Sequence, residues 1–478
     1  MLSLIIRYEW RRFRRNRLQV GLLAVLVLFG LYAIYYGQRQ MAGQRAAIAQ
    51  VQQTEQTEFA GYRAAAVADT AKPSDKDAYE EATQPTYAWH RHGYAATAPP
   101  APLAALVVGQ RDLNPGAYRL TGMGLYYQLF QNELANPQKL LVGNFDLAFV
   151  LVYLLPLFII VLSYGLLSAE RENGVLPLLH VQAASVRRLL LGKLLFGFAL
   201  VAGLALGLSV VGFGVAGAGR ATGWGVLGLW VLTVLAYCAF WFALVWLIVS
   251  FNRNSAVNAL TAVGMWLLFL LVVPSVLSAA LAVVRPVDSS QLATLVRRAA
   301  MDNEDSEPAV RAVIRQYLRQ HPGLAPAGDT LFQPNLGAKG YAAHFQLTAQ
   351  RQKPLVDEYL RAIAARETLA ARFSLLNPAV STQNLLSQLA GTDLPTYLRF
   401  FNSLPAFHRQ IVGFYFPRLF RNQPITAADL AADLAARPTF QAPLPTGAGV
   451  GAGLLQLLGA AALLFALGYW NLPGRLRG

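Results

Sequence analysis

The chain has 478 residues, of which 55% are hydrophobic and 14% charged, with a mean hydropathy of +0.38 and a formal net charge of +15. Soluble domains carry about 25% charged residues, so this composition excludes an ordinary soluble protein. The apolar residues also come in blocks, which favours an integral membrane protein. The single cysteine, Cys238, lies in an apolar run and has no partner for an internal disulfide.

The first element in chain order is a short basic segment, residues 1–17, that precedes the first apolar block. We expect an amphipathic helix that lies in the membrane surface, because Trp10 and other apolar side chains alternate with arginines. The arginines would reach lipid phosphates. A plain basic anchor is a second interpretation, compatible with the first. The basic residues are Arg7, Arg11, Arg12, Arg14, Arg15 and Arg17.

Six apolar blocks are long enough to cross a hydrocarbon core of about 30 Å. The second block contains Pro156 and the fifth contains Pro274, which membrane helices tolerate where a neighbour satisfies the freed carbonyl. The first block is too long for a signal peptide and lacks a cleavage site. We therefore predict an all-α polytopic membrane protein with six transmembrane helices. They are residues 18–36, 147–167, 194–218, 224–249, 257–284 and 447–472.

Two long segments, residues 37–146 and 285–446, separate these blocks and are predicted to form two mostly helical extracytoplasmic domains. In the first segment, Met41–Ala68 favours a continuation of the first membrane helix, and Lys72–Pro115 is predicted to be irregular because five prolines interrupt it. Helices are expected in the second segment near Ser289–Arg319, Tyr341–Leu376 and Thr396–Phe414.

Basic residues concentrate in the chain ends and in the short loops that six crossings would place on one side of the membrane. This side holds 13 basic and three acidic residues, whereas the short loop on the other side holds only Arg220. The positive-inside rule therefore predicts cytoplasmic termini, including the tail 473–478. Since topology explains most of the positive charge, the sequence does not indicate a nucleic-acid partner.

Several sequence signals of catalysis or ion coupling are absent. The chain has no Gly-x-x-x-x-Gly-Lys-[Ser/Thr] phosphate-binding loop, so it is not expected to hydrolyse ATP by itself. No charged residue or histidine lies inside the six blocks away from their ends, which argues against an ion-coupled transporter. His90 and His92 lack companion ligands at metal-binding spacing, and His344 and His408 are isolated. We therefore expect no catalytic site, metal site or cofactor in this chain.

The loop after the second block, residues 168–193, begins with the acidic-basic-acidic run Glu170-Arg171-Glu172 and continues to a leucine pair and Gly192-Lys193. This loop resembles the cytoplasmic signature of type-2 ATP-binding-cassette (ABC-2) permeases. In that family it forms a coupling helix that docks in a groove of the ATPase. The resemblance implies polar contacts by Glu170, Arg171 and Glu172, a turn at Gly174, a docking face of Leu176, Leu178 and Leu179, and membrane re-entry at Arg187, Arg188 and Lys193.

The order of elements and the runs Asn144–Val150, Leu375–Ala379 and Leu389–Asp393 resemble a bacterial branch of these permeases with two large ectodomains. The resemblance implies the permease subunit of an exporter for an unknown substrate. Its partners would be two copies of a separate ATPase, which binds ATP and magnesium, and an identical or homologous second permease. The alternative is a non-transporting membrane scaffold or sensor whose ectodomains bind a partner, with 168–193 an ordinary charged loop.

Small residues recur at helical spacing in two of the blocks. Gly203 and Gly207 are four residues apart in the third block, and Gly447 and Gly451 begin the sixth. Such spacing allows membrane helices to approach closely. We expect these glycines to pack helices within the chain, and a seam between two permease subunits is the alternative.

Overall fold

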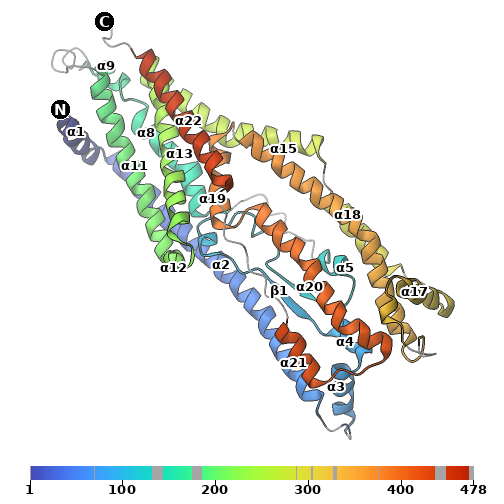
Figure 1. The fold of residues 1–478 in the computed structure, drawn as a ribbon. Coiled ribbons are helices and arrows are strands. Elements are labelled where there is room, and N and C mark those ends of the chain that lie inside the picture. Colours follow the sequence, from blue (N-terminus) through green and yellow to red (C-terminus); the bar gives the residue numbers. More distant parts are fainter. Residues whose placement is uncertain are drawn as a thin grey trace.

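The protein is elongated, with a helical bundle that carries both chain ends and a second body at the opposite end (Figure 1). We call the bundle end that holds the termini the terminal end, and the second body the distal domain. The computed structural model describes residues 2–68, 70, 72–131, 144–174, 186–286, 288–302, 305–326, 331–374, 376–436 and 448–472.

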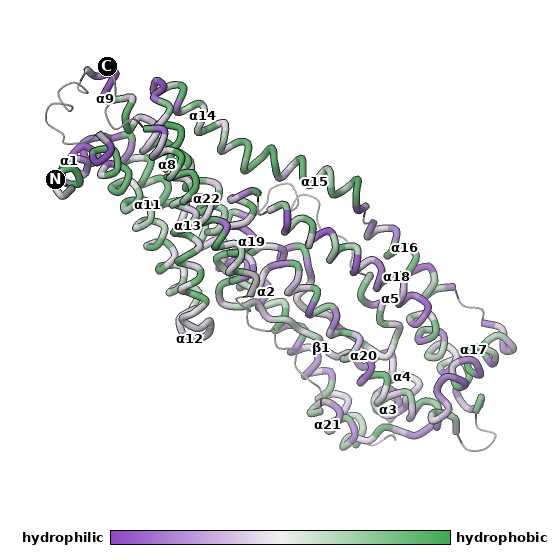
Figure 2. Tube along the Cα trace, turned by 45° about the horizontal axis from the view of Figure 1, so that its top comes forward, coloured by the Kyte–Doolittle hydropathy of each residue, from purple (hydrophilic) through white to green (hydrophobic). Residues whose placement is uncertain are grey.

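Six helical spans in the described residues are long and apolar enough to cross a membrane, so this is a multi-pass membrane protein. Apolar residues gather on the bundle helices, whereas apolar and polar residues are interspersed in the distal domain (Figure 2). The spans in chain order are α2 (Arg17–Ala65); α7 (Leu147–Phe149), η2 (Val150–Leu154), α8 (Leu155–Ser163) and α9 (Ser168–Glu172); α11 (Val186–Ala216); α13 (Trp224–Ser250); α14 (Ser255–Leu267), η3 (Leu268–Val272) and α15 (Val273–Val284); and α22 (Ala448–Asn471).

The predicted helix before the first span is present as α1 (Leu2–Arg15). Asn16 separates it from α2, because the Asn16 side chain accepts a hydrogen bond from the Gln19 backbone N–H at 3.3 Å and caps the longer helix. Helix α2 has 49 residues and is therefore roughly 74 Å long, far more than a bilayer core requires. The prediction that the first span continues as a helix beyond Met41 is confirmed.

Both spans that contain proline have a π-helical turn directly before it, η2 before Pro156 and η3 before Pro274. A proline removes a backbone donor and leaves a carbonyl without its helical partner. In the second span, the Tyr237 hydroxyl donates to the Val152 carbonyl at 2.8 Å. In the fifth, the Asn377 side-chain amide donates to the Phe269 carbonyl at 2.6 Å. Side chains from elsewhere in the fold thus satisfy the freed carbonyls.

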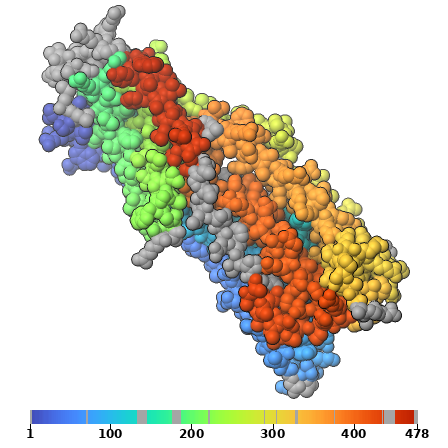
Figure 3. Space-filling view, viewed as in Figure 1, coloured from blue at the N-terminus to red at the C-terminus, as the bar shows by residue number. Residues whose placement is uncertain are grey.

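The two long insertions share one hydrophobic core, so they form a single distal domain and not the two separate domains expected from the sequence. From the first insertion, Phe59, Trp89 and Tyr94 are buried in this core, together with Tyr415 and Phe416 from the second. Helix α2 also contacts α21 (Ala427–Ala436), and the corresponding surfaces are continuous in Figure 3. Pairing of the two insertions buries aromatic area that neither could cover alone.

The segment predicted to be irregular, Lys72–Pro115, contains short helices and a strand instead. Three of the five prolines, Pro73, Pro85 and Pro102, begin helices, because a residue in the first helical turn needs no amide hydrogen. Strands β1 (Tyr94–Thr97) and β2 (Ala117–Leu120) pair antiparallel. The remaining elements are α3 (Pro73–Thr83), α4 (Pro85–Arg91), η1 (Pro102–Ala105), α5 (Leu125–Leu129), α16 (Ser289–Met301), α17 (Glu307–Gln320), η4 (Pro322–Leu324), α18 (Leu336–Ser374), α19 (Pro378–Ala390) and α20 (Leu394–Arg421).

Helices α18 and α19 form a hairpin that returns from the distal domain into the bundle. Helix α19 packs against α13 and α22, and its buried leucines belong to the same core as the membrane spans. At its start, Asn377 lies beside Phe269, at the middle of the fifth span. The sequence assigned all of 285–446 to an ectodomain, but α19, a helix of mixed composition, buries Leu385, Leu386 and Leu389 in the core of the bundle.

Candidate functional site

The run Glu170-Arg171-Glu172 lies at the terminal end of the bundle, in α9, and each of its side chains bonds to a different part of the chain. The predicted loop residues Leu176, Leu178 and Leu179 follow directly and lie outside the described residues. Gly174 ends α9 with a φ of 69°, a conformation that favours glycine. The base of the predicted coupling loop is thus built from α9 and its bonded neighbours.

The Glu170 carboxylate forms two ion pairs, one with Lys193 Nζ at 2.5 Å and one with Arg12 Nη1 at 2.8 Å. Lys193 is only 5% exposed and also lies 3.6 Å from Glu9. Two carboxylates and two cations therefore meet, and their charges balance. We call Glu9, Arg12, Glu170 and Lys193 the four-charge cluster. It joins α1, α9 and α11, and removal of one partner would leave a buried charge unpaired, which is costly.

Glu172 joins the same loop base to the fifth span. Its two carboxylate oxygens accept from the backbone N–H and the hydroxyl of Ser255, both at 2.7 Å. Ser255 is the first residue of α14, so a negative charge lies at the positive end of a helix, a favourable arrangement. Arg171 donates to the carbonyl and side chain of Asn252 in the preceding turn, at 2.9 and 3.0 Å.

Of the remaining predicted coupling residues, Arg187 joins α11 to the sixth span. Its guanidinium donates to the Leu472 carbonyl at 3.0 Å and lies 4.6 Å from the centre of the Tyr469 ring. A cation at the carboxyl end of a helix satisfies carbonyls that lack helical partners. Arg188 is exposed, next to Arg187. Of these two neighbouring arginines, Arg187 therefore connects the third and sixth spans, whereas Arg188 faces outward.

The predicted membrane-surface helix α1 packs on α11. Trp10 and Phe13 meet Phe196 edge-to-face, with ring centres 6.4 Å apart in both pairs. A Cβ added to Gly192 would come within 2.9 Å of Ile5, so glycine permits this close approach. Arg7, Arg11, Arg12, Arg14, Arg15 and Arg17 are all exposed. Their contact with lipid phosphates stays a prediction.

Sequence reasoning missed the residues that complete the site. Lys193 is a predicted coupling residue, but its pairing with Glu9 has no sequence signal, and Asn252 and Ser255 have no predicted role. The polar run from Asn252 to Ser255 between two apolar spans was the available signal. A cavity of about 280 Å³ lies beneath the cluster, lined in part by Asn16, Lys193 and Ser255. In the part of the chain described, no group of three or more His, Cys, Asp or Glu residues could hold a metal ion.

The predicted packing glycines do not pack within the chain. Gly203, Gly207 and Gly451 are exposed, and a Cβ added to each would meet nothing within 4 Å, while Gly447 lies outside the described residues. The spacing indicated a flat helix face, but that face points away from the other helices. Close contacts occur at other glycines, as at Gly453, where a Cβ would lie 2.9 Å from Leu385 of α19.

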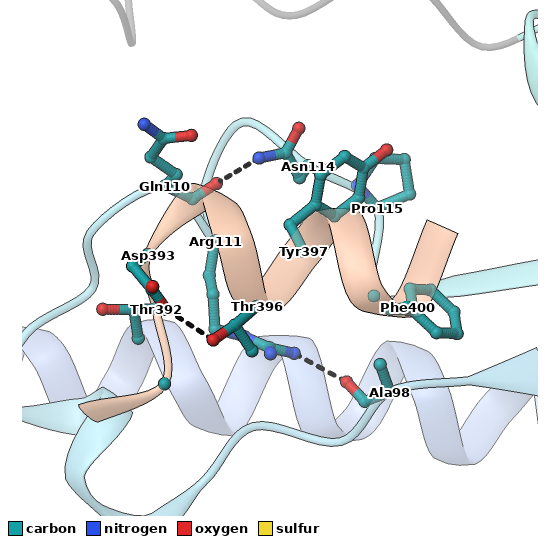
Figure 4. A pocket seen from close by; sticks show the side chains of 12 residues that line it. Ala98, Gln110, Arg111, Asn114, Pro115, Thr392, Asp393, Thr396, Tyr397 and Phe400 are labelled. Carbon is teal, nitrogen blue, oxygen red and sulfur yellow. Dashed lines mark hydrogen bonds between the residues drawn. The ribbon is translucent and has the colours of Figure 1, made fainter. Parts of the chain in front are cut away.

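A second polar pocket lies where the distal domain meets the bundle (Figure 4). Arg111 points between Gln44 and Ala98 and donates to both, at 3.1 and 2.7 Å. Burial and the neighbouring Arg45 lower the pKa of Arg111 to about 10. The free space is only about 30 Å³, room for about one water molecule. This pocket therefore organises the junction and does not admit a larger ligand.

A family model described as "Domain of unknown function (DUF3526)" matches residues 291–441. The matched stretch covers most of the second insertion, including the α18–α19 hairpin and α20. Comparison with curated proteins and with solved structures returned no match.

Proposed function

We propose that the chain is the permease subunit of an ATP-binding-cassette exporter of the ABC-2 type, working in a bacterial inner membrane with both termini in the cytoplasm. One observation carries the proposal. The base of the loop that resembles a coupling helix is bonded to three separate parts of the bundle: to α1 and α11 through Glu170, and to the fifth span through Glu172. A push on this loop would therefore move several helices together.

The proposed cycle follows these bonds. Two separate ATPase chains bind ATP and magnesium, close, and displace the loop 175–185. The four-charge cluster passes the displacement to α1 and α11, because separating its members would expose unpaired charges in a buried site. Glu172 pulls on the first turn of α14 and tilts the fifth span. A substrate of unidentified kind then moves between the spans toward the distal domain.

The remaining partners also follow from surface features. Arg7, Arg11 and the other exposed arginines of α1 would bind lipid phosphates and hold this helix in the membrane surface. The exposed faces at Gly203, Gly207 and Gly451 would accept a second permease subunit, identical or homologous. No ATP site is assigned to this chain, so hydrolysis would belong to the partner.

Co-purification tests the proposal. The tagged chain is extracted in mild detergent, its partners are identified by mass spectrometry, and the ATPase activity of the complex is measured. We expect an ATPase to accompany the chain and its turnover to fall in Glu170→Gln and Glu172→Gln. Arg409→Gln, an exposed change in the distal domain, is the matched control and should leave turnover unchanged. A chain free of any ATPase would instead favour the scaffold or sensor.

A further inference from the structure

A cavity of about 420 Å³ lies beside the distal half of the fifth span, far from the coupling site. Its walls come from α15, from the α18–α19 hairpin, and from the junction with the distal domain. Small-molecule sites in proteins have volumes of about 300–1,000 Å³, so a ligand could enter. The lining includes Leu277, Leu281, Arg366, Glu367, Ala370 and Val380.

The cavity has an apolar side and a charged side. Leu277 and Leu281 of α15 and Val380 of α19 form the apolar side, while Arg366 and Glu367 of α18 supply a positive and a negative charge. Successive helical residues point about 100° apart, so the two charges are separate anchoring points. Among the described residues, neither side chain forms a hydrogen bond or an ion pair, and the like charge of Asp393 acts on Glu367.

The position of these charges is unusual for a membrane protein. Pro274 lies near the middle of the fifth span, and the hairpin reaches the same depth, because Asn377 bonds to Phe269. Arg366 and Glu367 lie about 12 Å farther along α18 from this contact, toward the distal end of the fifth span. Charged side chains beside an apolar membrane span are costly, and such groups generally line a substrate or ion pathway.

The fifth span is open to the surrounding lipid. Only 11% of its most apolar stretch is buried inside the chain, and α15 leaves the bundle to run alongside α18 (Figure 1). An aliphatic chain seated on Leu277 and Leu281 could therefore continue into the bilayer. The narrow pocket at Arg111, by contrast, is too small for such a ligand.

We propose that this cavity binds an amphiphile with an aliphatic chain and a zwitterionic headgroup, whose ammonium pairs with Glu367 and whose phosphate pairs with Arg366. Both charges of such a headgroup find a partner, and both unpaired side chains are neutralised. The chain lies along α15 and extends into the distal leaflet. Its role as cargo rests on the proposed export function, whereas its binding does not.

Binding to the full-length chain, purified without an ATPase, tests the inference. The probe is a lysophosphatidylethanolamine with a 14-carbon chain, compared with the matching lysophosphatidylglycerol, which lacks the ammonium. Affinities are measured by native mass spectrometry. We expect the ethanolamine lipid to bind about tenfold more tightly, the typical effect of one hydrogen bond to a charged group.

Three variants and one control sharpen the test. Glu367→Gln should remove the preference for ethanolamine, Arg366→Gln should weaken both lipids about tenfold, and Ala370→Trp should block the cavity. Arg372→Gln, an exposed change on the same helix, should bind both lipids as the wild type does. If Ala370→Trp fails to fold, the two charge variants still decide.

Equal affinity for the two lipids in the wild type, or unchanged binding in both charge variants, would overturn the inference. That outcome leaves the export function intact if an ATPase still co-purifies. Conversely, headgroup-selective binding by a chain that recruits no ATPase would sustain the site and contradict the exporter.

Discussion

The second and fifth spans share an interruption, a proline preceded by a π-helical turn, but they lie in different surroundings. In the second span 61% of the most apolar stretch is buried, against 11% in the fifth. Tyr237, from a neighbouring span, satisfies the freed carbonyl of the second. Asn377, from the inserted hairpin, satisfies that of the fifth. The second span is therefore fixed within the bundle, whereas the fifth is held at a few points.

The contacts that hold the fifth span lie at its start, beside the proposed coupling loop, and at its middle. Glu172 holds the start of the fifth span beside the proposed coupling loop, and Asn377 holds its middle. Pro274 follows the middle of the span and lines the cavity. A span with few lateral contacts can transmit a tilt from one end to the other at little packing cost. We therefore propose the fifth span as the moving element and the second as the rigid part against which it moves.

The largest expected effect is at the end of the second span, where the four-charge cluster holds this rigid part. Lys193→Met removes the cation shared by Glu9 and Glu170 and should lower the free energy of unfolding by about 4 kcal/mol. Thermal unfolding in detergent measures this loss. Adding Glu9→Gln and Glu170→Gln to the variant should recover most of it, since the one charge left in the cluster, that of Arg12, is 44% exposed and stays hydrated. A single variant as stable as the wild type would contradict a rigid second span.

The next effect concerns the distal domain that supports the fifth span. Burial lowers the pKa of His408 to about 4, and its ring bonds to the Met123 carbonyl at 2.7 Å. The unfolded chain takes up the proton near pH 6.5 but the folded chain only near pH 4, so stability is present above pH 6.5 and is lost as the pH falls. The loss should total about 3 kcal/mol.

Thermal unfolding between pH 7 and pH 4 checks this expectation against a matched variant. His408→Gln can still donate to Met123 but cannot take up a proton, so its stability should fall less steeply with acidification. The same slope in the variant and the wild type would show that other groups control the acid response.

A direct comparison of the two spans replaces the donors to their freed carbonyls. Tyr237→Phe leaves the Val152 carbonyl unsatisfied, and Asn377→Ser keeps an oxygen that can cap α19 but cannot reach Phe269. Each should cost about 2 kcal/mol. Hydrogen exchange followed by mass spectrometry should then show faster exchange near Val152 in the first variant and near Phe269 in the second. If either variant raised hydrogen exchange equally in both spans, the distinction between a fixed second span and a loosely held fifth span would be contradicted.

The smallest expected effect separates two glycines of the sixth span. A Cβ at Gly453 would meet Leu385 at 2.9 Å, whereas one at Gly451 would meet nothing within 4 Å. Gly453→Ala should therefore lower stability by about 1 kcal/mol by displacing α19. Gly451→Ala should be neutral or slightly stabilising, because alanine favours the helix. The two melting temperatures, measured side by side, decide whether α19 is seated in the bundle.

The sequence was sufficient for the six spans, a helix before the first span and the continuation of the first span, because long apolar runs and helix-favouring runs are local signals. It could not predict that the two insertions share a core, since the contact of Trp89 with Phe416 joins residues far apart in the chain. The glycine spacing showed a flat face but not what covers it. The partners of Glu170 and Glu172 likewise lie on other helices, α1, α11 and α14, whose packing is not a local signal.

The central claim, that the loop beside Glu172 receives the ATPase, is tested most directly by site-specific crosslinking. Cys238 is the only cysteine, so Cys238→Ala gives a cysteine-free chain. Asn173→Cys, exposed at the loop base, and Trp224→Cys, exposed at the opposite end of the bundle, are each labelled with a benzophenone. We predict that only the label at position 173 crosslinks to a co-purified ATPase, with a yield that changes when ATP is added. No crosslink at 173, or one indifferent to ATP, would contradict the account.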